Sequence, residues 1–403
     1  MTLAGARTWD ALVIGAGPAG ARAAQQLSTA GASTLLLEKQ SLPRYKACGG
    51  GVPARTLRLL DDLDIAPVSE GHVDTIDVSR FGQPQFRKKS ERPLAWMVMR
   101  DRFDQFLTDL AAESGASVAD STPVQSIFET DDCYEIETPT GTVRARHILA
   151  ADGATGPTAR WLGIASAPTR SAAYEVEVAA PRDALDHWHQ AANVDVGYRP
   201  WGYGWVFPKQ GKLSVGVVNA PKRGRSIRKH TDRYLARLGL AHSEVLKIQG
   251  HPIRYRRSRN EPVAQGLALL LGDAAGLADE FTAEGIAYAL HSANLAADAV
   301  LDSDNPAATY TESINQHIQP ELNAARTISR LYYWCITTWP WLALKTSKHV
   351  NYLWRAFFRV MRGESTYAAE LSTLALGHFA REIVRALGTA HAAFPPQRNT
   401  WKD

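Results

Sequence analysis

Three glycines near the start of the chain are spaced as Gly-x-Gly-x-x-Gly, a pattern that can cradle a phosphate. Gly15, Gly17 and Gly20 follow an apolar run at residues 9–14 and begin an alanine-rich segment that continues to about Ala30. Gly15 permits a tight turn, Gly17 lets a pyrophosphate approach the backbone, and Gly20 lets a helix pack closely on a strand. Because a helix N-terminus also presents unpaired amides to an anion, the segment predicts a dinucleotide-binding turn.

An acid stands at the end of the next predicted strand. Residues 34–37 are apolar and lead into Glu38, about 20 residues after the glycines, where a carboxylate can accept both ribose hydroxyls. The place of the motif at the very start of the chain favours FAD over NAD(P). The predicted cofactor-binding residues here are Gly15, Ala16, Gly17, Pro18, Ala19, Gly20, Glu38 and Lys39.

Three later segments could complete such a site. Arg100 precedes a predicted helix, Asp152-Gly153 ends an apolar strand, and Gly272-Asp273 follows the buried strand 267–271. Taken singly, these are an exposed arginine and two turns. Together with the glycine motif they favour a cofactor site, because an aspartate at a strand's carboxyl end can accept a ribitol hydroxyl. Gly285-Ile286 then begins a long helix whose N-terminus can face phosphate or the flavin.

A cysteine followed by three glycines forms a second unusual segment. Lys46, Cys48, Gly49 and Gly50 belong to a loop that can lie flat against a ring system. Cys48 alone would be interpreted as a small buried residue. Next to the glycines, we expect it to belong to the site, whereas Cys133 and Cys335 have no such context.

Alternating aromatic residues form a third segment. In a strand, Tyr203, Trp205 and Phe207 share one face. The plain alternative is core packing, but flanking Pro200 and Pro208 and a hairpin turn at residues 210–211 favour an aromatic wall in a substrate domain.

The joint pattern resembles the flavoprotein hydroxylase-like class over roughly residues 9–300, and within it the geranylgeranyl reductase family. That family resembles this chain in Lys46-x-Cys48-Gly49-Gly50, in P-x-x-Y-x-W-x-F-P from Pro200 to Pro208, and in the run 272–286. The resemblance implies that Arg100 contacts FAD, that Val124 lies by the adenine, that Asp152-Gly153 lies near the diphosphate, and that Asp273 binds the ribityl chain. It also implies non-covalent FAD, NADPH or a reduced ferredoxin as electron donor, and no separate NADPH domain.

Those reductases saturate isolated double bonds of geranylgeranyl chains. Hydride attack on an isoprenoid alkene must be matched by protonation, so a dry aromatic pocket that stabilises positive charge is needed. We assign catalysis to Cys48, Tyr203 and Trp205, and the substrate pocket to Tyr203, Trp205, Phe207 and Pro208. Cys48, Tyr203 or a bound water could deliver the proton. No metal ligand set is expected.

Two departures keep other functions open. The family leads us to expect Pro at Glu280 and Gly at Ala283, beside the flavin's reactive edge. The alternatives are an FAD monooxygenase of a small or lipid substrate on the shared scaffold, and a flavoprotein binding or maturation factor without alkene reduction. A halogenase is less favoured because no W-x-W-x-I-P-like motif is present.

Composition narrows the remaining choices. The 403 residues suggest two or three domains, and a net charge of +4 is too small to indicate nucleic acid. Three scattered cysteines predict no disulfides. We expect no signal peptide. We also expect no transmembrane helix, since the apolar stretch at residues 331–344 is too short and too interrupted to span a bilayer. The expected location is the cytoplasm, or the inner face of a membrane as a peripheral protein.

Nine aromatic residues are concentrated between residues 332 and 358, with Lys345, Lys348, Arg355 and Arg359 among them. They suit either a membrane interface or helices packed on the substrate domain. A second basic cluster, residues 254–259, is predicted to be a solvated face; the alternative is attraction of a diphosphate, NADPH or anionic headgroups. The tail from Pro395 is predicted to be loose.

These observations predict an α/β fold with a Rossmann-like FAD-binding domain, an inserted β-rich substrate domain and a helical C-terminal region. The FAD-binding domain is expected to be discontinuous, from residues 1–75, 96–165 and 262–303. The substrate-binding sheet is expected from residues 76–95 and 166–261, and the helical region from 304–403.

Overall fold

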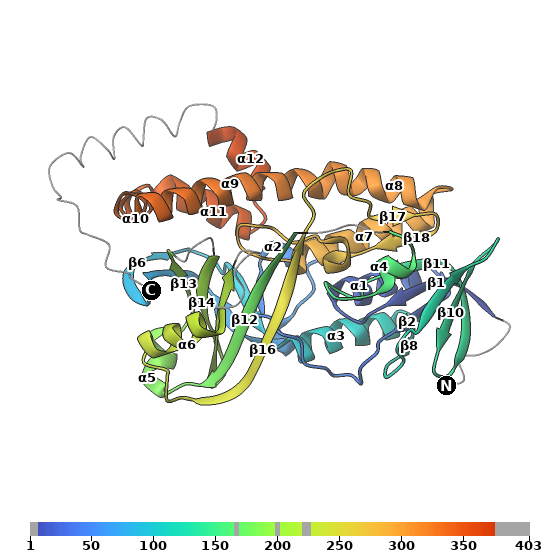
Figure 1. The fold of residues 1–403 in the computed structure, drawn as a ribbon, viewed down its shortest axis with the longest axis horizontal. Coiled ribbons are helices and arrows are strands. Elements are labelled where there is room, and N and C mark those ends of the chain that lie inside the picture. Colours follow the sequence, from blue (N-terminus) through green and yellow to red (C-terminus); the bar gives the residue numbers. More distant parts are fainter. Residues whose placement is uncertain (1–6, 165–168, 198–201, 220–226, 375–403) are drawn as a thin grey trace.

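The computed structural model describes residues 7–164, 169–197, 202–219 and 227–374. A parallel sheet, an antiparallel sheet and a layer of C-terminal helices make up the molecule (Figure 1). The predicted α/β fold class is therefore confirmed. Pro200 and the tail from Pro395 lie outside the described residues.

The parallel sheet has the order β17-β18-β11-β1-β2-β8, and its central strand is the apolar run that precedes the glycines. Strands β2, β11, β18 and β8 run parallel to their neighbours, whereas β17 is antiparallel. The bounds are β1 Thr8–Ile14, β2 Thr34–Leu37, β8 Ser117–Ala119, β11 Gly141–Ala150, β17 Ala264–Gln265 and β18 Ala268–Leu270. Parallel strands bring their carboxyl ends, and the turns that follow them, to one edge.

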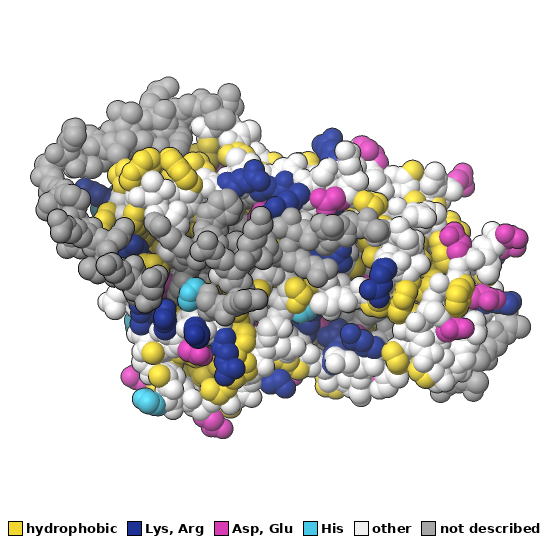
Figure 2. Space-filling model, viewed as in Figure 1, with side chains coloured by type: hydrophobic (Ala, Val, Ile, Leu, Met, Phe, Trp, Pro, Cys, Tyr) yellow, Lys and Arg dark blue, Asp and Glu magenta, His cyan; other side chains and the backbone are white. Residues whose placement is uncertain are grey.

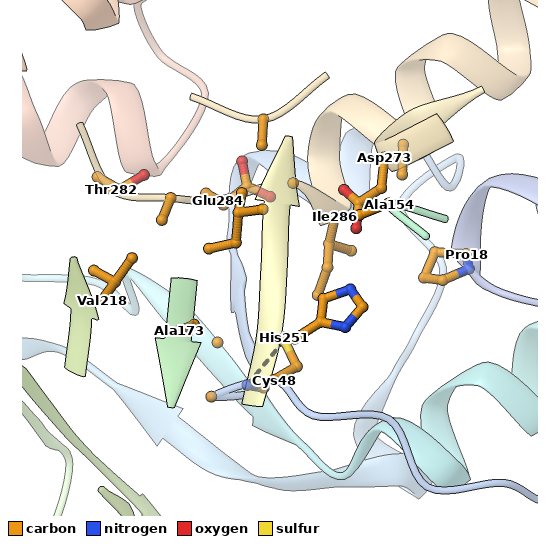
Figure 3. Close-up of a pocket in the computed structure, with 18 of the residues that line it drawn as sticks. Pro18, Cys48, Ala154, Ala173, Val218, His251, Asp273, Thr282, Glu284 and Ile286 are labelled. Atoms are coloured by element: carbon orange, nitrogen blue, oxygen red, sulfur yellow. Dashed lines mark hydrogen bonds between the residues drawn. The ribbon is translucent and has the colours of Figure 1, made fainter. Parts of the chain in front are cut away.

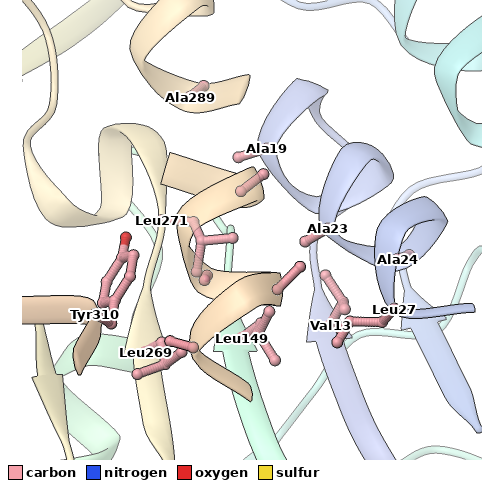
Figure 4. Packing of buried hydrophobic residues seen from close by; sticks show 14 of the residues in the cluster. Val13, Ala19, Ala23, Ala24, Leu27, Leu149, Leu269, Leu271, Ala289 and Tyr310 are labelled. Atoms are coloured by element: carbon pink, nitrogen blue, oxygen red, sulfur yellow. The ribbon is translucent and has the colours of Figure 1, made fainter. Parts of the chain in front are cut away.

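Alanine-rich helices cover one face of this sheet. Helices α1 (Pro18–Thr29) and α7 (Ile286–Asp302) pack on each other and on strand residues such as Val13 and Leu149 (Figure 4). Small side chains permit this close packing. Helix α3 (Arg100–Glu113) also packs on α1, and α8 (Pro306–Ser313) packs on α7.

A short meander covers the opposite face. Strand β10 (Tyr134–Thr138) pairs antiparallel with β11 on one side and with β9 (Ser126–Glu129) on the other. Their Ile127 and Ile136 pack under the sheet. The short helix α4 (Thr158–Trp161) lies on the same side.

The second sheet has seven strands in the order β16-β12-β15-β14-β13-β5-β6. The predicted hairpin is confirmed, because β14 and β15 pair from Lys209 and Lys212 outward. The bounds are β5 Thr75–Arg80, β6 Gln83–Lys89, β12 Thr169–Ala179, β13 Ala191–Val196, β14 Gly202–Lys209, β15 Lys212–Asn219 and β16 Glu244–Tyr255. Helices α5 (Arg182–His187) and α6 (Ile227–Arg237) pack against this sheet.

The sheets are connected by a small three-stranded sheet. Strand β3 (Gly51–Pro53) continues the cysteine loop and pairs with β7 (Ala95–Val98), which also pairs with β4 (Ser69–Val73). Helix α2 (Arg55–Arg58) follows β3.

The C-terminal helices lie across the seven-stranded sheet (Figure 1). Their bounds are α9 Gln319–Thr338, α10 Pro340–His349, α11 Asn351–Met361 and α12 Tyr367–Thr373. Tyr333, Leu344 and Phe358 join Val78 and Met97 in one hydrophobic core. The inner side of these helices therefore packs on the seven-stranded sheet, as one of the two interpretations of this segment expected. Within the described part of the chain, no helix is long and apolar enough to cross a bilayer.

Candidate active site

The glycine turn leaves an open space directly over its second glycine. Gly15 has φ +101°, and a Cβ there would lie 2.6 Å from the carbonyl oxygen of Ala151. A Cβ on Gly20 would lie 1.9 Å from the oxygen of Gly15. At Gly17, by contrast, the nearest atom to a Cβ is an Arg44 nitrogen at 3.7 Å. Two glycines therefore permit the fold, and the third keeps space free where α1 begins.

Buried charges surround that space. Glu38 accepts a hydrogen bond from the backbone N–H of Ala16 at 3.0 Å and pairs with Arg44 at 2.9 Å. Arg44 also donates to Asp104 at 3.0 Å, and Arg100 pairs with the same carboxylate at 2.7 Å. The acid at the end of β2 is thus held against the glycine turn.

Asp152 and Asp273 lie at the ends of two parallel strands of the same sheet. Asp152 accepts from the backbone of Thr158 at 2.9 Å, but its Oδ1 is buried with no partner among the described residues. Burial raises the pKa of this carboxyl, so a hydroxyl donor would suit it. Asp273 lies beside Gly285, where a Cβ would approach its carboxylate to 3.1 Å, at the N-terminus of α7.

One cavity of about 900 Å³ joins these features to the second sheet (Figure 3). The residues predicted from sequence that line it are Gly15, Gly17, Pro18, Ala19, Glu38, Lys39, Lys46, Cys48, Gly49, Gly50, Arg100, Val124, Asp152, Gly153, Tyr203, Trp205, Phe207, Asp273, Gly285 and Ile286. Ala16, Gly20, Gly272 and Pro208 are not among the lining residues. The glycine cradle and the unpartnered Asp152 oxygen fit a dinucleotide with ribose or ribityl hydroxyls.

The cysteine loop lies flat against the aromatic wall. A Cβ on Gly49 would lie 2.8 Å from the Phe207 ring, and Gly50, at φ +72°, has no room beside the carbonyl oxygen of Val98. Cys48 Sγ accepts from the backbone N–H of Gly50 at 3.4 Å. The missing side chain of Gly49 therefore lets this loop approach the ring of Phe207 closely.

The wall itself is continuous. Tyr203, Trp205 and Phe207 follow one another along β14, with successive ring centroids 6.3 Å apart. The Tyr203 hydroxyl donates to the backbone oxygen of Thr282, in the loop before α7. This hydrogen bond joins the seven-stranded sheet to the loop before α7.

A buried glutamate that no sequence motif indicated lies behind this wall. Glu175 of β12 accepts from the backbone N–H of Cys48 at 2.8 Å and from Ser214 Oγ at 2.5 Å. Trp205 Nε1 donates to the same Ser214 oxygen at 3.2 Å. Burial raises the pKa of Glu175. One carboxyl therefore holds both the cysteine loop and, through Ser214, the central tryptophan.

A lysine–histidine pair lies where the two ends of the cavity meet. Lys46 Nζ is within hydrogen-bonding distance of the His251 ring, and His251 lies near Cys48 (Figure 3). Burial lowers the pKa of Lys46 to about 8. Burial and the neighbouring ammonium lower the pKa of His251 to about 4, so the imidazole is neutral at pH 7. His251 was not predicted.

The C-terminal helices complete the far end of the cavity. Tyr332, Tyr333, Trp354 and Phe357 line it, and the Phe281 ring packs edge-on against Tyr332 at 5.7 Å. Part of the C-terminal aromatic cluster therefore belongs to the same chamber as the wall on β14, although the sequence suggested separate roles.

The two unusual residues of the loop before α7, Glu280 and Ala283, have different consequences. Glu280 pairs with Arg257 at 2.9 Å and with Arg326 of α9 at 2.8 Å, contacts that a proline could not make. Ala283 adopts φ +58°, the left-handed region that favours glycine. The loop keeps its turn at some cost in strain and gains an anchor to the helical layer.

The prediction of a solvated basic face at residues 254–259 is wrong. Arg254 and Arg256 are 6% and 1% exposed, and only Arg259 is well exposed. Arg256 donates to the backbone oxygen of Glu261 and to Gln319 of α9, while Arg257 pairs with Glu280. Arginines carry five donors, so these side chains join irregular backbone to the C-terminal helices.

Comparisons with known proteins agree with this geometry. Residues 8–301 match the FAD binding domain family. The chain belongs to this family. It is 30% identical to an uncharacterized protein of Methanosarcina barkeri over 327 residues, which cover 81% of this chain and 83% of that protein.

Two further relatives name a chemistry. A digeranylgeranylglycerophospholipid reductase of Thermoplasma volcanium is 28% identical over 319 residues, 72% of this chain and 77% of that protein. The crystal structure of a geranylgeranyl bacteriochlorophyll reductase-like protein of Thermoplasma acidophilum superposes with a TM-score of 0.72 at 22% identity, covering 95% and 99% of the two chains. The protein is an FAD-dependent oxidoreductase and a distant homologue of geranylgeranyl reductases.

Proposed function

We propose that this FAD-dependent oxidoreductase reduces isolated C=C bonds of a geranylgeranyl or related isoprenoid chain. The observation that carries the proposal is the aromatic chamber that begins at the cysteine loop and shares one cavity with the cofactor cradle. An alkene has no carbonyl that a polar group could polarise. Its reduction requires dry, apolar walls and faces that stabilise positive charge, and Tyr203, Trp205 and Phe207 supply them.

Bound FAD, reduced by NADPH or a ferredoxin, would supply hydride. The chain's own residues hold the alkene and handle the proton. Gly49 and Gly50 keep the Cys48 thiol at the edge of the chamber, and Glu175 fixes the backbone of that loop. Cys48 is our favoured proton donor, because the Tyr203 hydroxyl hydrogen is directed at a backbone oxygen.

One experiment separates this function from its alternatives. The protein is reduced without oxygen and given geranylgeranyl diphosphate or a geranylgeranylated lipid, and the product mass is measured. A gain of two hydrogen atoms per double bond supports the reductase. Turnover that requires oxygen would instead identify a monooxygenase, and the absence of both would leave a binding or maturation role.

Variants at the chamber test the assigned roles. We expect Cys48→Ala to lower alkene reduction by roughly a hundredfold, the contribution typical of a general acid, while FAD remains bound. Trp205→Ala should also lower it, and Trp205→Phe, which keeps a ring, should retain more activity. Cys133→Ala is the matched control, since Cys133 does not line the cavity. Full activity in both Cys48→Ala and Trp205→Ala would refute the roles.

A further inference from the structure

Large apolar side chains are exposed on the outer side of α9 and α10. Of the ten that are exposed among the described residues, five lie between residues 331 and 342. They are Leu331, Trp334, Trp339, Trp341 and Leu342, with 40–64% of each accessible, and we call them the tryptophan face. Exposed apolar groups concentrated in this way mark a contact site.

Two rings of the tryptophan face contact each other across the turn between α9 and α10. The Trp334 and Trp339 rings pack edge-on with centroids 4.8 Å apart, which joins the end of α9 to the start of α10. Trp341 and Lys345 are four residues apart on α10 and therefore share a side of that helix. Figure 2 shows hydrophobic and basic side chains side by side over this end of the helical layer.

The charge of this segment has one sign. No Asp or Glu occurs from residue 322 to residue 363. The cations in that stretch are Arg326, Arg330, Lys345, Lys348, Arg355, Arg359 and Arg362. Arg326 and Arg359 pair with Glu280 and Glu370, whereas Arg330, Lys345 and Lys348 are exposed beside the tryptophan face.

The same helices have a second, inward side. Tyr332 and Tyr333 line the cavity, while the adjacent Leu331 and Trp334 point to solvent. A single layer of helices therefore separates the tryptophan face from the substrate chamber. We propose that the tryptophan face binds the surface of an anionic lipid bilayer, with the chamber directly behind it. Tryptophan beside lysine and arginine suits the headgroup region.

A bilayer fits this surface better than a second copy of the chain. A symmetric dimer through the tryptophan face would bring Lys345 and Lys348 of the two copies together, and like charges repel. An anionic membrane would be attracted by the same cations. The proposal deepens the proposed function, because an isoprenoid lipid is a membrane-borne substrate, but its test does not depend on turnover.

Vesicle flotation provides the test for the apolar part. The full chain loaded with FAD is mixed with vesicles of phosphatidylcholine alone or with added phosphatidylglycerol. We expect the protein to float with the mixed vesicles, and Trp339→Ala/Trp341→Ala to lower the partition coefficient by roughly tenfold. Phe128→Ala is the matched control, because Phe128 is also a large apolar residue, 54% exposed, but lies on β9 and not on the C-terminal helices. Equal loss in the control would overturn the proposal.

Charge variants provide the second arm. Lys345→Gln/Lys348→Gln should lower binding to phosphatidylglycerol vesicles by about twenty-fivefold, since each cation near an anionic surface contributes about fivefold. Binding to neutral vesicles should change little. Arg182→Gln, at a side chain 88% exposed on α5, should match the unaltered protein.

Two other results would contradict the proposal. One is wild-type protein that does not float; the other is a solution mass, measured by light scattering, that halves in Trp339→Ala/Trp341→Ala. The second result would assign the face to a second copy. Turnover of detergent-dispersed substrate is measured separately. A protein that floats but reduces no alkene would refute the proposed function and leave the membrane contact standing.

Discussion

The two ends of the cavity are built by different means. At the end formed by the glycine turn, which we expect to hold the nucleotide, backbone geometry shapes the cavity. Gly15 and Gly20 permit a tight turn that leaves space over Gly17. At the substrate end, side chains from β14, the cysteine loop and the C-terminal helices form the walls. We therefore expect the glycine turn to tolerate almost no added atom, whereas the proposed substrate end should accept changes without loss of the cofactor.

The strongest way to test this contrast is a pair of matched glycine variants. Gly17→Ala should lower FAD affinity by roughly a hundredfold, because its methyl would occupy the space a pyrophosphate needs. The apoprotein should keep its unfolding midpoint, since that methyl meets nothing closer than 3.7 Å. Isothermal titration and urea unfolding measure the two quantities.

Gly20→Ala supplies the control for that pair. Its Cβ would lie 1.9 Å from a backbone oxygen, so we expect loss of stability even without FAD. If Gly17→Ala unfolds as readily as Gly20→Ala, then the space over Gly17 serves the fold and not the ligand.

At the proposed substrate end, a change at Glu175 should disturb the catalytic loop without disturbing FAD binding. The two carboxylate oxygens of Glu175 accept from Cys48 and Ser214, but a glutamine side chain has only one oxygen. Glu175→Gln would therefore either place its amide N–H against the Cys48 N–H or lose the hydrogen bond from Ser214. We expect kcat/KM for alkene reduction to fall by roughly thirtyfold, as misplaced groups do, with FAD affinity unchanged.

Glu177→Gln is the matched control on the same strand. Glu177 is buried, pairs with Lys209 and Lys212, and contacts the Tyr45 side chain, but it does not accept from the backbone N–H of Cys48 as Glu175 does. A parallel loss of FAD affinity in Glu175→Gln would show that the two ends of the cavity are not separable.

The same contrast explains how much the sequence could predict. The glycine turn, Glu38 and the strand β1 lie within about one βαβ unit, so spacing alone determines their relative positions. The alternation of Tyr203, Trp205 and Phe207 is likewise local, and the structure confirms the hairpin that carries it.

Long-range contacts account for what the sequence did not show. Glu175 is 127 residues from Cys48, and His251 is 205 residues from Lys46. Neither Glu175 nor His251 belongs to a sequence motif that indicates a chemical role. The buried Arg256 was misassigned for a similar reason, because its partners come from α9 and from an irregular turn.

Lys46 lies where the two ends of the cavity meet. The pH dependence of its charge can show to which end it contributes. Its titratable neighbours are Asp273, Arg100, Cys48, Asp104 and His251. Because the pKa of Lys46 is lowered to about 8, its charge is present below pH 8 and is lost above it. If Lys46 attracts the anionic cofactor, FAD affinity should fall by up to about tenfold between pH 7 and 9. Fluorescence titration measures this, and Lys46→Gln should flatten the profile; an unchanged slope would assign Lys46 to the substrate end.

The smallest predicted effect concerns Ala283, on the loop between the two ends. A non-glycine residue in the left-handed region costs about 1 kcal/mol, and replacement by glycine also loosens the unfolded chain. We expect Ala283→Gly to raise the free energy of unfolding by about 0.5 kcal/mol in urea titrations, with FAD affinity unchanged. A decrease would mean that the Ala283 methyl packs usefully against the cavity. In that case the methyl group of Ala283, which lines the cavity, would stabilise the fold by packing and would not be merely a strained substitute for glycine.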